Sequence, residues 1–135
     1  MSVAAELELQ GAVLAQLKAD AAVMSLLAGR VHDHVPEETS HPYCSFGPAD
    51  AVQEDDDCSN AVTVALQIDV WSRKPGSAEA KGIAAAIRRS LHDADLTLTD
   101  NALVYIQHRD TSTFTDADGL TTHAAMTFEA VVEQP

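Results

Sequence analysis

The chain has 135 residues, 46% of them hydrophobic, which is enough for one domain with a core and too few for two ordinary domains. Asp and Glu outnumber Lys and Arg by 21 to 8, and the formal net charge of -13 excludes the clustered cations of a phosphate-binding surface. No apolar run approaches the ~18 residues of a membrane span and no signal peptide is recognisable, so we expect assembly in a reducing cytoplasm.

Two helices are predicted at the start of the chain. Residues 3–20 read as the first, because apolar side chains recur at i, i+4 spacing. Those side chains are Ala5, Leu9, Val13 and Leu17. Asp20 can cap a second, short helix over residues 21–28, and Gly29 can end it.

Three strands are predicted next. Residues 30–35 alternate like a short strand, and residues 42–52 form another that Gly47-Pro48 interrupts, as expected at an edge or a bulge. The polar loop 53–60 joins it to a long strand over 61–72, in which every second residue is apolar. We therefore expect a hairpin from the second and third strands.

A third helix and further strands complete the pattern. Ser77 is the predicted N-cap of the helix, whose core stripe is Ile83, Ile87 and Leu91. Strands are predicted over 96–99, 102–110 and 123–133, with Asp118-Gly119 as a turn before the last one. This order predicts an α+β fold with a largely antiparallel sheet of about five or six strands and helices packed on one face.

The only tryptophan, Trp71, lies on the polar side of the 61–72 strand, opposite to the apolar side. Trp and Arg are enriched at the centres of protein interfaces, so Trp71 and the nearby Arg73 suggest a surface that a second chain covers. Two alternatives remain open: another part of the same chain covers the indole, or a bulge near the strand end turns it to the other face.

Three histidines and a thiol near the first strands are possible zinc ligands: His32, His34, His41 and Cys44. Their spacing matches no established zinc pattern, which favours surface histidines and a small core cysteine. We therefore predict no metal site.

The remaining motifs give no specific sign of an enzyme. Asp55-Asp56-Asp57 lacks the framework of a calcium loop, and the run Asp116 to Gly119 lacks its closing Glu. The chain has no nucleophile elbow and no glycine-rich phosphate-binding loop. These motifs therefore give no positive reason to predict an enzyme.

Several stretches of the chain, taken together and in order, resemble a known family. They are the helix ending in LKAD, LLAGRVHDHVP, PYCSFG, the segment QIDVWSR that leads into a helix, and Asp118-Gly119 before a long final strand. The pattern is similar to the small tail-completion, or tail-terminator, proteins of long-tailed phages and gene transfer agents.

The resemblance implies a single tail-terminator-like domain over residues 1–135 that forms a homohexameric ring on the head-proximal end of the tail tube. Such a ring stops tube polymerisation, contacts the tail tube protein and the head–tail connector protein, and lets DNA pass without specific binding. It implies a component of a virion or phage-like tail, assembled in the host cytoplasm, with no catalysis, cofactor or membrane. The alternatives are another head–tail neck or connector protein, a small metal-dependent enzyme using His32, His34 and His41, or a ligand-binding module.

Two sets of residues are candidates for the work of such a ring. The interface between copies is assigned to Trp71, Arg73 and Phe114. Carboxylates are expected to project toward the channel or its rim, where they would repel DNA phosphates. These are Glu54, Asp55, Asp56, Asp57, Asp116 and Asp118.

Overall fold

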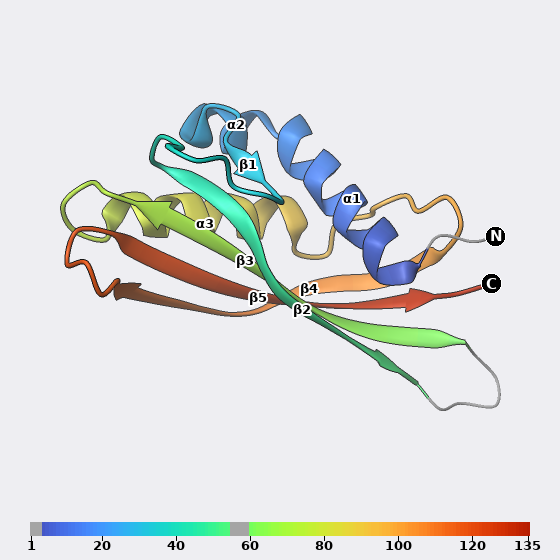
Figure 1. The fold of residues 1–135 in the computed structure, drawn as a ribbon. Coiled ribbons are helices and arrows are strands. Elements are labelled where there is room, and N and C mark those ends of the chain that lie inside the picture. Colours follow the sequence, from blue (N-terminus) through green and yellow to red (C-terminus); the bar gives the residue numbers. More distant parts are fainter. Residues whose placement is uncertain (1–3, 55–59) are drawn as a thin grey trace.

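The computed structural model describes residues 4–54 and 60–135, which form three helices and a five-stranded sheet. All three helices lie on one face of the sheet (Figure 1). The helices are α1 (Ala5–Ala19), α2 (Ala21–Leu27) and α3 (Ala78–Leu91). The strands are β1 (Val31–His32), β2 (Tyr43–Gln53), β3 (Ala61–Ser72), β4 (Ala102–Thr115) and β5 (Thr122–Glu133), in the spatial order β1-β2-β3-β5-β4. The predicted α+β class is confirmed.

The core lies between the helices and the sheet. The alternating apolar residues of β3 and β5 face it, as the strand period predicts, and Met126 and Phe128 are fully buried. The α3 stripe of Ile83, Ile87 and Leu91 packs against them with the predicted residues of α1. Among the described residues, no helix is long and apolar enough to span a membrane.

The edge region of the sheet differs from the prediction in the length of β1. β2 carries the predicted irregularity, because its pairing with β3 shifts between Phe46 and Ala49. β1 is only two residues long, however, and pairs in parallel with Cys44 and Ser45. The chain bends after His32, so His34 lies outside the strand predicted over 30–35.

Residues 96–99 do not form the predicted strand. Leu96 is buried in the core and Leu98 packs against it, so both apolar side chains contribute to the core between the helices and the sheet. The carboxylate of Glu8 in α1 accepts the backbone N–H groups of Asp100 and Asn101, which ties the end of this segment to a helix. Core packing and the hydrogen bonds to Glu8 thus hold this segment in place of the backbone hydrogen bonds of a strand.

Two further details depart from the sequence pattern. β4 runs to Thr115, beyond the predicted end at residue 110, because its Thr-rich end pairs with β5 as far as Thr122. α3 starts after Ser77 as predicted, but the Ser77 hydroxyl makes no capping hydrogen bond. Glu79 in the first turn instead accepts a bond of 2.7 Å from the Ser72 hydroxyl.

Candidate functional site

Four ring side chains cross the helix-free face of the sheet in one row, which we call the aromatic row. The strand register aligns Tyr43 of β2, Trp71 of β3, His123 of β5 and Phe114 of β4. The Trp71 and His123 rings stack with centroids 3.9 Å apart, and Phe114 meets His123 edge-on at 4.8 Å. Tyr43 lies 6.3 Å from Trp71 on the other side. Trp71 belongs to this row, which explains why a large ring lies on the otherwise polar side of β3.

Polar groups beside the row hold its rings in place. The Trp71 Nε1–H donates to Ser45 Oγ at 3.1 Å, and His123 Nε2 lies 2.6 Å from Asp69 Oδ1. The side-chain amide of Gln67 donates to the same Asp69 oxygen at 2.9 Å. Asp69 is only 6% exposed, so its bonds are shielded from water. These hydrogen bonds hold the Trp71 and His123 rings in defined positions on the sheet.

The alternatives for Trp71 can now be compared with its surroundings. β3 and β5 pair without a register shift from Ala61 to Ser72, so no bulge of that ladder turns the indole to the other face. Its own chain covers part of it, through His123, Tyr43 and Ser45. Trp71 is neither buried nor fully exposed, and part of the indole remains available for contact.

Arg73 extends from the end of β3 toward the turn between β4 and β5. Its side chain is 57% exposed; the Nε–H donates to Thr121 Oγ1 at 3.3 Å, and Nη2 lies 3.9 Å from Asp118 Oδ2. Asp118 Oδ1 accepts the N–H groups of Leu120 and Thr121, and Oδ2 accepts the Thr121 hydroxyl. These donors, the Leu120 N–H first, lower the pKa of Asp118 to about 2. Asp118 is therefore a structural carboxylate of the turn.

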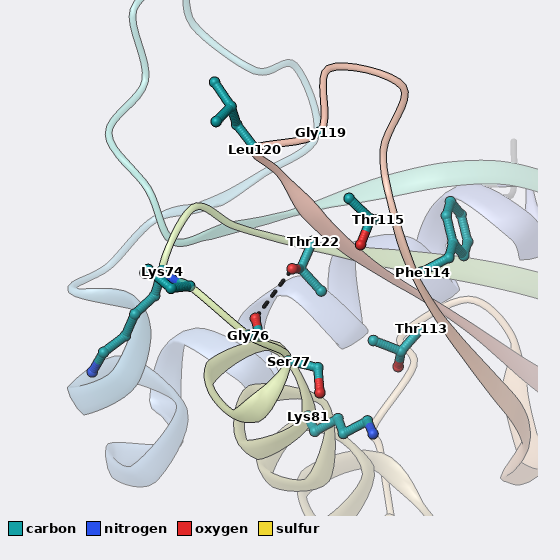
Figure 2. Close-up of a pocket in the computed structure, with 11 residues that line it drawn as sticks. Lys74, Gly76, Ser77, Lys81, Thr113, Phe114, Thr115, Gly119, Leu120 and Thr122 are labelled. Carbon is teal, nitrogen blue, oxygen red and sulfur yellow. Dashed lines mark hydrogen bonds between the residues drawn. The ribbon is translucent and has the colours of Figure 1, made fainter.

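A cleft of about 320 Å³ lies beside this turn, between the start of α3 and the end of β4 (Figure 2). Lys74 and Lys81 line it, together with Phe114 and Leu120, whose exposed fractions are 47% and 71%. The hydroxyl of Thr122 donates to the Gly76 carbonyl at 3.2 Å across its floor. The cleft thus brings together two cations and two exposed apolar side chains.

The predicted channel carboxylates do not form one patch in the described part of the chain. Glu54 follows β2, where Gln53 pairs with Val62, and it accepts a bond of 2.5 Å from the Thr63 hydroxyl. Asp116 and Asp118 lie at the opposite end of the sheet, at the turn between β4 and β5. Asp55, Asp56 and Asp57 lie outside the described residues.

The possible zinc ligands are separated. His32 is in β1, His34 is exposed in the following loop, and the His41 ring lies 5.1 Å from that of Tyr43. Cys44 points into the core, where burial raises the pKa of its thiol to about 12. Within residues 4–54 and 60–135, no three His, Cys, Asp or Glu side chains are grouped to hold a metal ion.

Sequence reasoning did not find the partners of Trp71. Tyr43, Ser45 and His123 lie 28, 26 and 52 positions away, and only the strand register brings them to the indole. His123 does share the polar parity of its strand, which was the one signal available.

Comparison with known proteins gives the family. The sequence matches the family described as "Tail completion protein gp17" over residues 11–133. A chain in the solved structure "Virion of native gene transfer agent (GTA) particle" superimposes with a TM-score of 0.90 at 32% identity, covering 98% of this chain and 99% of that chain. No curated protein sequence matches. The chain belongs to the tail completion protein family and is a structural protein of a phage-type tail rather than an enzyme.

Proposed function

We propose that the protein is a tail terminator, one domain over residues 1–135 that forms a homohexameric ring on the head-proximal end of the tail tube. In this position it stops tube polymerisation and joins the tail to the head connector. The observation that carries the proposal is the near full-length likeness, at a TM-score of 0.90, to a chain of a gene transfer agent virion. The tail completion family supports it over residues 11–133.

A ring of identical copies requires two different, complementary surfaces on each copy. Trp71, Arg73 and Phe114 form part of one of them in our proposal. Trp and Arg are typical interface anchors. His123 and Ser45 already fix the Trp71 ring, so little side-chain freedom is lost when a neighbour docks.

The net charge of -13 suits a tube through which DNA must slide. Carboxylates along a channel repel phosphates and prevent binding. Glu54 at one end of the sheet and Asp116 and Asp118 at the other would then contribute to the two rims of the channel. The proposal for Asp55, Asp56 and Asp57 beside Glu54 rests on the sequence alone.

Negative-stain microscopy of the purified protein, alone and mixed with tail tubes, tests the proposal. We expect a hollow disc at one end of each tube, and tubes that no longer elongate when tube protein is added. Discs that attach to isolated head connectors but never to tube ends would instead indicate another neck protein.

The assignment of Trp71 is tested separately by Trp71→Ala, with Trp71→Phe as the matched control. The alanine variant removes the indole from the row and is expected to weaken ring formation at least tenfold, whereas phenylalanine keeps a flat apolar ring. Light scattering at matched concentrations measures the oligomer, in the presence of tubes where free subunits stay monomeric. An unchanged oligomer size for Trp71→Ala would remove Trp71 from the interface.

A further inference from the structure

β2 and β4, the outermost long strands of the sheet, are covered on their outer side by their own chain over part of their length. On the β2 side, β1 pairs with Cys44 and Ser45, and the Cys44 N–H donates to the Arg30 carbonyl at 3.0 Å. On the β4 side, the Asp93 N–H donates to the Ile106 carbonyl at 2.8 Å, and the His108 N–H donates to Nδ1 of His92 at 3.0 Å. In both places a short segment stands where a further strand would pair.

Further along, β2 and β4 each have an open outer side. Residues 49–53 of β2 and 110–115 of β4 have no outer backbone partner within the described part of the chain. We call these segments the β2 open edge and the β4 open edge. Almost all of their residues are exposed. Each segment directly follows a register shift of its strand and carries one charged side chain, Asp50 or Asp110, but neither segment contains Lys or Pro. An exposed edge without Lys or Pro keeps backbone groups that can pair with another strand.

We propose that the β4 open edge of one copy pairs antiparallel with the β2 open edge of the next, so that the sheet continues from subunit to subunit. This inference rests on the ring of the preceding section. β3 is antiparallel to β2 and to β5, and β5 is antiparallel to β4, so β2 and β4 run in opposite directions. Copies related by rotation about a ring axis therefore bring the two edges together with antiparallel polarity.

The positions of the two edges favour closure of the sheet. Ala51 pairs with Val64 of β3, while Thr113 is aligned through Ala124 with Val70, so the open edges lie at opposite ends of the sheet. When the two edges are joined, each copy is displaced along the strand direction by about six residues, roughly 20 Å, relative to its neighbour. The four strands that each copy contributes are together roughly 19 Å wide. The strands would then tilt by about 45°, close to the 35–45° of closed β-barrels.

Side chains at the two edges agree with the pairing. Val52 on β2 and Phe114 on β4 both belong to the helix-free face, through their partners Thr63 and His123. They are 52% and 47% exposed, among the most exposed large apolar side chains in the described structure. With Ala51 opposite Thr113, the pairing places Val52 of one copy opposite Ser112 of its neighbour and diagonal to Phe114, so the two apolar side chains cover each other at the junction.

The first test compares Val52→Lys with the matched control Val104→Lys. Val104 is 54% exposed, lies at the other end of β4 and gives the same change of charge. A lysine on the open edge is expected to weaken association at least tenfold, whereas the control assembles like the parent protein. Sedimentation measures assembly, and thermal melts check that both variants are folded. Normal assembly of Val52→Lys, or equal loss in both variants, would overturn the pairing.

The second test locates the contact in the assembled protein. Hydrogen exchange is expected to slow at residues 49–53 and 110–115 when rings form. In a Cys58→Ser background, copies with Val52→Cys should form disulfides with copies with Ser112→Cys, and Thr63→Cys, one strand further in, should not. If rings form but hydrogen exchange at these two segments does not slow, the edge pairing is overturned and the proposed function is not. Complete absence of rings, also at tube ends, overturns the proposed function and the pairing with it.

Discussion

At the scale of single residues, the aromatic row depends on how closely β2 approaches β3. Gly47, at the irregularity of β2, makes this approach possible because it has no Cβ. A Cβ at this position would lie 2.6 Å from Asp69 Oδ2 and 3.0 Å from Gln67 Nε2. Asp69 cannot move easily to relieve the contact, since it is buried and bonded to His123.

Gly47→Ala is therefore expected to destabilise the protein by about 1–3 kcal/mol, the usual range for an overpacked site. Gly82→Ala is the control, because Gly82 lies in α3 and an added Cβ would meet no atom within 4 Å beyond its chain neighbours and the nearby backbone of its own helix. It is expected to stabilise the fold by about 0.5–1 kcal/mol. Denaturant unfolding measures both values. A neutral Gly47→Ala would show that the carboxylate of Asp69 is free to move.

The turn carboxylate Asp118 predicts a pH dependence. Its pKa is about 2 in the folded protein, below its ordinary value, so the ionised form stabilises the fold. This contribution is complete above the unfolded pKa of about 4, and it is lost as the pH falls through the folded pKa. Asp118→Ala is expected to lower the melting temperature at pH 7, and its difference from the parent should shrink toward pH 2. A difference that stays constant with pH would contradict this account.

At the scale of elements, α1 is attached to the sheet by burial and by one carboxylate. Glu8 accepts hydrogen bonds from the Asp100 and Asn101 N–H groups and from the Asn101 side chain. Burial raises the pKa of Glu8, but these bonds outweigh it and leave the pKa lowered. One side chain of a helix thus fixes the loop that leads into β4.

Glu8→Ala is expected to lower the melting temperature at neutral pH, since it removes the carboxylate to which two backbone N–H groups donate. Glu6→Ala is the matched control, because Glu6 is an exposed residue of the same helical turn. Its effect is expected to be small. Equal effects of the two variants in thermal melts would show that the bonds to Glu8 add nothing to stability.

The elements with strong periodicity could be predicted from the sequence, whereas those decided by distant contacts could not. The i, i+4 stripes of α1 and α3 and the alternation in β3 and β5 are local, and burial follows them. Residues 96–99 alternate like a strand, but Leu96 packs under the helices and Glu8 binds the segment that follows. The Thr-rich end of β4 resembles a loop in sequence and forms a strand through its pairing with β5.

The site could be predicted only in part for the same reason. Strand parity singled out Trp71, because a large apolar ring stands among polar residues. Its stacking on His123 and its bond to Ser45 depend on the strand order β2-β3-β5. No local pattern encodes that order.

At the scale of the whole molecule, the net charge of -13 opposes the association of copies. Salt screens this repulsion, since the Debye length falls from about 30 Å at about 0.01 M to about 8 Å at about 0.15 M. We expect ring formation to increase over this range of sodium chloride, measured by light scattering with sucrose of equal osmolarity as the control. Rings that dissociate in salt would indicate an interface dominated by ion pairs.

The burial of Cys44 and Met126 has a consequence for durability. Both sulfur side chains lie within the core, and the raised pKa keeps the Cys44 thiol protonated. Oxidants attack thiolates and accessible thioethers most readily. A particle cannot replace a damaged subunit after it has left the cell that made it. Because the sulfur atoms of Cys44 and Met126 are shielded, exposure of the particle to oxygen should leave the packing of the core intact.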